Sequence, residues 1–184
     1  MPQAALAATP RSTLFRTVRP EPDSARRRRV AHLVQARVRD CLDAAGCTVT
    51  RADDHQVDAA LPADAEGAAL LERLLVDVTG RLHADLIGGE NATRLSRARG
   101  RPLPRLRWEE AVSLLDADAA CELDARQSDA LIRHGGGLPL HLTDLPGPAR
   151  GAVLLPFGGR AGEVRADALH LDLDALERYV LGAA

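Results

Sequence analysis

The sequence contains no lysine and very few aromatic residues. All 24 of its basic side chains are arginine, which excludes chemistry through a lysine Schiff base or a lysine nucleophile. The aromatic residues are Phe15, Trp108, Phe157 and Tyr179, so leucine, valine and alanine must form the core. No apolar run approaches the roughly 20 residues that a membrane-spanning helix needs. We therefore expect a globular protein that does not enter a membrane.

Paired cysteines and a strong net charge are also missing. The odd number of cysteines, Cys41, Cys47 and Cys121, and the lack of Cys-x-x-Cys spacing do not suit a disulfide framework or a zinc site. They are expected to be small buried residues in a reducing compartment, which indicates a cytoplasmic protein. The net charge of -2 gives no general attraction to nucleic acid. The arginines at 26–29 could contact RNA phosphates, but no aromatic residues are interleaved for base stacking, so nucleic acid is not an expected partner.

Hydrophobic periodicity predicts a single domain behind a short arm. Residues 1–20 are rich in alanine, arginine, serine and threonine and are expected to be disordered, and residues 21–184 are expected to form the domain. Helices are predicted over 24–45, 64–82, 108–115, 124–134 and 173–181, and strands over 47–50, 55–60, 138–143, 151–155 and 163–171. Strands and helices do not alternate strictly. We therefore expect an α+β fold, with an antiparallel sheet backed by helices.

Two stretches in the second half of the chain carry a resemblance to a known family. Residues 104–112 read PRLRWEEAV, and residues 138–146 read LPLHLTDLP. In this order they resemble the catalytic domain of class II aminoacyl-tRNA synthetases, closest to the asparaginyl and aspartyl type. The resemblance implies a reduced form of that family's catalytic fold. It also implies that an active member would use ATP, magnesium and an amino acid.

The first half of the chain matches this family in part. Residues 30–50 look like the helix and strand of its first motif, which forms the dimer interface, so the resemblance implies a homodimer or heterodimer through helix 24–45. The proline of that motif, expected near Ala52 or Asp53, is absent. The second motif, Phe-Arg-x-Glu, whose arginine grips the α-phosphate of ATP, has no match. Residues 57–82 instead resemble the segment that follows this motif.

Three later segments match residue types that serve the nucleotide in the family. Asp144 stands in Thr-Asp-Leu-Pro, which matches Thr-Asp-Tyr-Pro. Glu163 follows a segment that resembles Leu-Val-Pro-Gly-x-Gly-Glu-Ile, in which the glutamate helps to hold magnesium and the nucleotide. Glu177 and Arg178 resemble the end of the third motif, Gly-x-Gly-x-Gly-x-Glu-Arg, whose arginine contacts the γ-phosphate, but the three glycines are replaced.

The resemblance therefore implies a set of site residues. Arg178 and Glu163 would be catalytic, and Glu163 would also be the magnesium ligand. Asp144, Glu177 and Arg178 would bind the nucleotide. These assignments depend on the four side chains converging in the fold.

Two interpretations of function remain open. A triphosphate needs glycine for close backbone approach and a positive clamp, and the lost second motif and lost glycines remove both. The first interpretation is a degenerate synthetase-like protein without the ATP-binding motifs, which serves as a non-charging accessory or binding protein with an amino acid as candidate ligand and no certain cofactor. The alternative is an ATP-dependent amino-acid-activating ligase in the specialised metabolism of a high-GC bacterium. In that case ATP and magnesium would form an aminoacyl-adenylate, and an arginine from residues 94–101 would have to fold over the site.

Overall fold

Seven strands and five helices make up the part of the chain that the computed structural model describes, residues 23–86, 102–115, 123–157 and 159–182. In chain order these elements are α1 (Asp23–Ala44), β1 (Thr48–Ala52), β2 (Gln56–Ala60), α2 (Gly67–Asp85), β3 (Arg105–Arg107), α4 (Trp108–Leu115), α5 (Ala125–His134), β4 (Leu140–Thr143), β5 (Ala149–Leu155), β6 (Gly159–Arg165), β7 (Ala168–Asp172) and α6 (Leu173–Leu181). None of the described helices is both long enough and apolar enough to cross a membrane.

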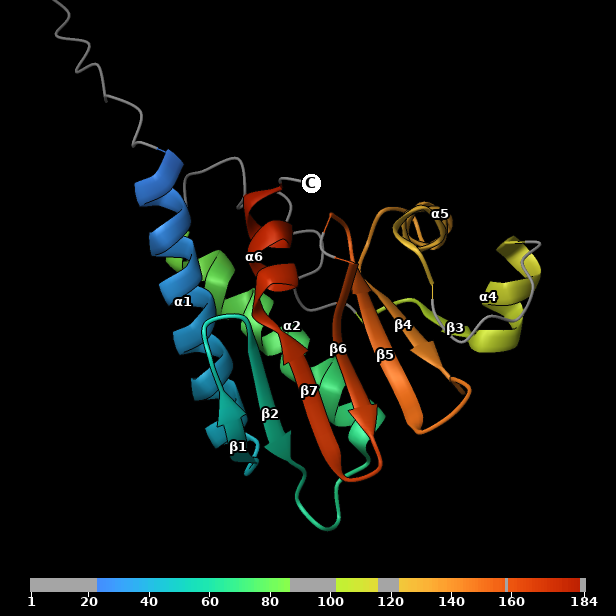
Figure 1. Ribbon diagram of the computed structural model, residues 1–184, viewed down its shortest axis with the longest axis horizontal. Coiled ribbons are helices and arrows are strands. Elements are labelled where there is room, and N and C mark those ends of the chain that lie inside the picture. Colours follow the sequence, from blue (N-terminus) through green and yellow to red (C-terminus); the bar gives the residue numbers. More distant parts are fainter. Residues whose placement is uncertain (1–22, 87–101, 116–122, 158, 183–184) are drawn as a thin grey trace, which may run out of the picture.

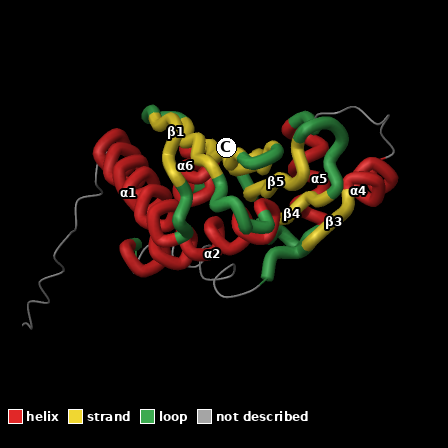
Figure 2. The backbone as a smooth tube through the Cα atoms, turned by 90° about the horizontal axis from the view of Figure 1, so that it is seen from below, coloured by secondary structure: helices red, strands yellow, loops and turns green. Residues whose placement is uncertain are grey.

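All seven strands belong to one sheet, in the order β1-β2-β7-β6-β5-β4-β3. Every neighbouring pair is antiparallel except β3 and β4, which are parallel. Helices α1, α2 and α6 form a layer on one face of the sheet, and α5 lies against the other face at the β4–β5 end (Figures 1 and 2). The predicted α+β fold with an antiparallel sheet backed by helices is confirmed.

Strand β5 separates two hydrophobic cores. Its residues Val153 and Leu155 belong to the larger core, which lies between the sheet and helices α1, α2 and α6. Its residues Ala152 and Leu154 point to the opposite face and join a smaller core with Leu131 of α5. Successive side chains of a strand point to opposite faces, so one apolar strand can serve both layers. Burying each leucine or valine side chain stabilises the fold by roughly 1.5–3 kcal/mol.

The strands nearer β1 are buried on one face only. In β7, Leu169 and Leu171 are buried beneath the helical layer, whereas His170 and Asp172 are only partly covered. Strand β2 shows the same alternation, with Val57 and Ala59 buried. The sheet face opposite α1 and α2 is therefore polar along β2 and β7.

A buried polar cluster joins α2 to β3 and β4. The carboxylate of Glu72 accepts hydrogen bonds from the backbone N–H of Leu103 at 3.0 Å and from Arg105 at 3.0 and 2.7 Å. It also lies 3.2 Å from Nδ1 of His141, a side chain that is 1% exposed. Burial opposes the ionisation of Glu72, but the hydrogen bonds outweigh it, and the pKa of Glu72 lies below its ordinary value. This cluster fixes the short β3 strand beside β4.

One predicted strand is wrong. The segment 163–171 is not continuous but forms the β6–β7 hairpin, because the chain reverses at Ala166 and Asp167. Ala166 has a φ of +50°, in the region that favours glycine, and no glycine marks this turn in the sequence.

One further strand and one helix boundary also differ from prediction. Strand β3 was not predicted, and the helix expected from residue 64 begins at Gly67, after a turn in which Ala65 N–H donates to Pro62 O. The predicted arm 1–20 and Cys121 lie outside the described residues.

Candidate functional site

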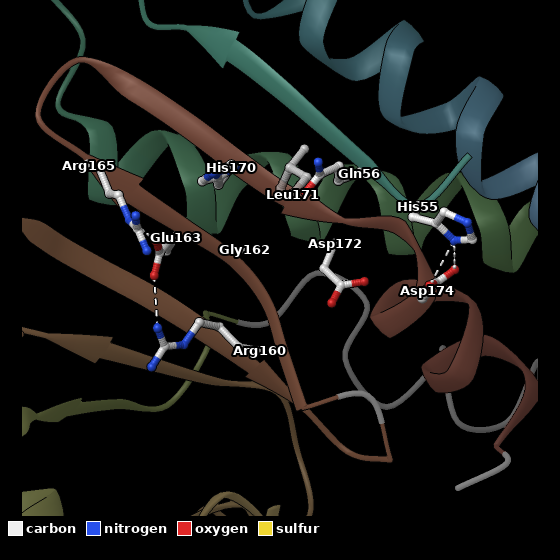
Figure 3. Close-up of a pocket in the computed structure, with 10 residues that line it drawn as sticks. All are labelled: His55, Gln56, Arg160, Gly162, Glu163, Arg165, His170, Leu171, Asp172 and Asp174. Carbon is white, nitrogen blue, oxygen red and sulfur yellow. Dashed lines mark hydrogen bonds and ion pairs between the residues drawn. The ribbon is translucent and has the colours of Figure 1, made fainter. Parts of the chain in front are cut away.

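A pocket of about 380 Å³ opens on the polar face of the sheet, between β6, β7 and the start of α6. Polar and apolar residues alternate along β7 because its polar side chains face this pocket, whereas its apolar side chains point into the helical core on the other face of the sheet. Figure 3 shows the side chains gathered around it. The lining residues are His55, Gln56, Arg160, Gly162, Glu163, Arg165, His170, Leu171, Asp172 and Asp174.

Strand register brings the lining residues together from distant parts of the chain. His170 of β7 is paired with Asp58 of β2 on one side and with Glu163 of β6 on the other. These three side chains therefore form a row across the sheet. Nδ1 of His170 lies against Oδ1 of Asp58.

Glu163 is the most buried charged group of the pocket. The residue is 5% exposed, and its Oε2 accepts a hydrogen bond from Nη1 of Arg160 at 2.9 Å. Its Oε1 lies against Nε of Arg165, in an ion pair without hydrogen-bond alignment. Both guanidinium groups converge on the Glu163 carboxylate in Figure 3. The negative charge of Glu163 is therefore compensated inside the protein.

The start of α6 forms the opposite wall. The Asp172 carboxylate accepts a hydrogen bond from Ala175 N–H at 2.8 Å and so caps the helix. Asp174, in the first turn, lies 3.0 and 3.2 Å from Nδ1 of His55, and this contact raises the pKa of His55 above its ordinary value. Leu173 N–H also donates to His55 O at 2.8 Å, so the β1–β2 turn is attached to the helix.

The structure places only one of the four predicted site residues, Glu163, in this pocket. Asp144 lies in the turn after β4, where its side chain is 71% exposed and 3.8 Å from Nε of Arg107. Glu177 and Arg178 follow the first turn of α6 and do not line the pocket. Burial raises the pKa of Glu177 above its ordinary value, and the nearby charge of Asp174 adds to this effect. The other three residues do not line this pocket, and the roles given to the four stay predictions.

Sequence reasoning missed most of the lining residues. Arg165 could have been linked to Glu163, because residues two apart on a strand share a face. Asp172 could have been recognised as a helix cap, since aspartate is favoured before a helix begins. His55 carries no such signal, because its place depends on β2 lying beside β7.

The residues of the pocket do not fit ATP with magnesium. The described residues include no group of three or more histidine, cysteine or acidic side chains arranged to hold a metal ion. Glu163, the predicted magnesium ligand, lies between two guanidinium groups, whose positive charge would oppose a divalent cation. The lining contains three carboxylates against two arginines, which gives no positive clamp for a triphosphate.

Comparisons with known proteins identify the fold. No protein-family model and no curated protein matches the chain. Among solved structures, the asparaginyl-tRNA synthetase from Pyrococcus horikoshii superposes with a TM-score of 0.64 at 13% sequence identity. The Entamoeba histolytica asparaginyl-tRNA synthetase, in complex with asparaginyl-adenylate, superposes with a TM-score of 0.69 at 10% identity. This chain has a class II synthetase-like fold.

The match covers only part of each synthetase. Each superposition covers 88% of this chain and 65% of the synthetase, so the chain corresponds to less than two thirds of those proteins. The synthetase-like fold agrees with the resemblance found in residues 104–112 and 138–146 of the sequence. Function has to be argued from the pocket, because a shared fold does not establish a shared activity.

Proposed function

We propose that this chain is a non-charging, synthetase-like binding protein, which holds a small polar ligand without activating it through ATP. The observation that carries the proposal is the carboxylate of Asp172, which accepts the Ala175 N–H at the start of α6. The N-terminus of a helix is where a phosphate group would be favoured, because unpaired N–H groups and the helix dipole attract anions there. In this chain a carboxylate already takes that place.

A second carboxylate strengthens this argument. Asp174 places a second carboxylate in the first turn of α6, and its partner His55 compensates it fully only when the imidazole is protonated. A triphosphate at this wall would meet two like charges within one helical turn. Such repulsion is weakly screened at distances shorter than the Debye length of about 8 Å at physiological salt.

An amino acid is the candidate ligand. Its ammonium group would be favoured beside Asp172 and Asp174, and the pocket volume of about 380 Å³ is within the range of small-molecule sites. Gln56, on the same wall, provides an amide that can donate to and accept from a polar ligand. This part of the proposal predicts that the ligand carries no phosphate.

The alternative, an ATP-dependent amino-acid-activating ligase, is favoured by one observation. Arg160 and Arg165 both line the pocket, and arginine is the residue that best matches phosphate oxygens. Under this alternative they would replace the missing arginine of the second motif. Both arginines are, however, paired with Glu163.

The test is an exchange assay between labelled pyrophosphate and ATP, with each of the 20 standard amino acids and magnesium. We expect no exchange above the level without protein. An active asparaginyl-tRNA synthetase in the same buffer is the positive control. Exchange that depends on asparagine or aspartate would refute the non-charging proposal and support the ligase.

We also propose that the protein dimerises in the cytoplasm through α1 and the neighbouring edge strand β1. Strand β1, next to α1, is a sheet edge whose five residues are all exposed, and Val49 is among them. An exposed edge strand of this kind is prone to pair with another chain. The free thiols of Cys41 and Cys47 suit a reducing compartment. Sedimentation velocity should detect a dimer, and a Val49→Arg variant should shift it towards monomer; a wild-type monomer at all concentrations would refute dimerisation.

A further inference from the structure

The arrangement around Glu163 suggests a role that goes beyond the proposed function. We propose that Glu163 is a built-in anion: its carboxylate occupies the space between Arg160 and Arg165 that a phosphate group of a ligand would otherwise take. Beside Asp172 and Asp174, Glu163 would then be a further residue that makes the pocket select against phosphate-bearing ligands. The geometry of β6 places Glu163 between the two arginines independently of the carboxylates at α6.

A bulge in β6 brings the two arginines to the same side. Val153 of β5 is opposite Gly162, but Leu154 is opposite Arg160, so Ala161 is an extra residue in the β6 strand. Residues three apart in a regular strand point to opposite faces, and one extra residue restores them to the same face. Arg160 therefore reaches Glu163, while Arg165 shares its face by ordinary alternation.

The resulting cluster has the geometry of an occupied anion site. Two guanidinium groups bind one carboxylate, which is almost fully buried, and both arginines remain partly exposed towards the pocket. Each guanidinium has five N–H donors, and the contacts to Glu163 involve one nitrogen of each. A phosphate oxygen would use the same planar donors, but it would lie close to the carboxylate and be repelled.

Removing only the charge of Glu163 should therefore create an anion site. Glu163→Gln keeps the size of the side chain and an acceptor oxygen for Arg160, and it frees the positive charge of both arginines. The probe is inorganic phosphate at pH 7.5, followed through the Nε–H signals of Arg160 and Arg165 in ¹⁵N-labelled protein. We expect the variant to bind phosphate at least about tenfold more tightly than the wild type.

Two controls define the interpretation. Glu109→Gln removes an exposed carboxylate on α4 and should leave phosphate binding at the wild-type level. The double variant Glu163→Gln with Arg160→Gln should lose the gain, because one of the two guanidinium groups is gone.

Two results would overturn the inference. The first is an equal phosphate affinity of Glu163→Gln and wild type. The second is saturable phosphate binding by the wild-type protein at the Arg160 and Arg165 signals, a result that does not depend on the variant folding. Neither result bears on ATP–pyrophosphate exchange by the wild type, so the inference and the non-charging part of the proposed function fail separately.

Discussion

Substitution of Glu72 tests how α2 holds the β3 edge of the sheet. The carboxylate serves three donors, the Leu103 N–H, the Arg105 guanidinium and Nδ1 of His141. Arg105 is 62% exposed at its side chain, so water can replace this contact, and the ion pair is worth no more than about 1 kcal/mol. The Leu103 N–H and His141 are buried, and leaving either without an acceptor costs about 1–3 kcal/mol.

These values give different expectations for two variants. Glu72→Gln retains one acceptor oxygen, so one buried donor loses its partner and the free energy of unfolding should fall by about 1–3 kcal/mol. Glu72→Ala removes both acceptors and leaves a void, so the fall should reach about 3–5 kcal/mol. For a chain of this length, each kcal/mol corresponds to a shift of about 2–4 °C in Tm.

The assay is urea unfolding at pH 7.5, followed by circular dichroism. Asp77→Asn on the same helix is the matched control, because Asp77 is exposed, and it should change the unfolding free energy by less than about 0.5 kcal/mol. Equal stabilities for Glu72→Ala and Asp77→Asn would refute the idea that this cluster holds β3.

Acidity should affect the same cluster in a defined direction. The pKa of Glu72 is lowered in the folded protein from its ordinary value of 4.5, so its contribution to stability is present above about pH 4.5 and is lost as pH falls through the folded-state pKa. Burial lowers the pKa of His141 from 6.5, so the unfolded chain takes up this proton first, and stability falls as pH drops below about 6.5. A glutamine side chain cannot titrate. Urea unfolding of the Glu72→Gln variant should therefore show a smaller fall in unfolding free energy below about pH 4.5 than the wild type shows.

Two further predictions concern backbone positions. Gly162→Ala should lower the unfolding free energy by about 1–3 kcal/mol, because a Cβ there would lie 2.8 Å from Leu71 Cδ1 and 2.9 Å from Leu171 Cδ2. Gly80 lies in open space on α2, so Gly80→Ala should raise the unfolding free energy by about 0.5–1 kcal/mol. Thermal melts that rank the two variants the other way would contradict this account. Ala166→Gly should stabilise the β6–β7 hairpin by about 0.4–1 kcal/mol, because the φ of +50° is strained for alanine; a lower midpoint in urea would contradict this expectation.

Local pattern in the sequence was sufficient for much of the fold. The apolar spacing of α1 and α2 and the capping residues of α5 and α6 define helices without reference to the rest of the chain. Two elements depend on tertiary contacts instead. Strand β3 has only three residues and is held by β4 and Glu72, and the β6–β7 turn places alanine where glycine would be expected.

The candidate site was less predictable than the fold. Glu163 was found through a matched residue type, but the place of its partner Arg160 depends on the bulge at Ala161, which no local signal marks. Glu177 and Arg178 matched two letters of a motif, yet they lie beyond the first turn of α6. Short identities of this kind do not fix the register of a helix relative to a pocket.

The position of β5 between the two cores divides the molecule into layers of unequal strength. The larger core joins α1, α2 and α6, whereas α4 and α5 are held mainly by the smaller cluster around Trp108 and Leu131. Opening of the smaller layer would expose one face of β5 while its other face stayed packed. Amide hydrogens of α4 and α5 would then exchange with solvent through a partial opening, well before those of α2, and this half of the fold could change its covering helices without dismantling the pocket on β6 and β7.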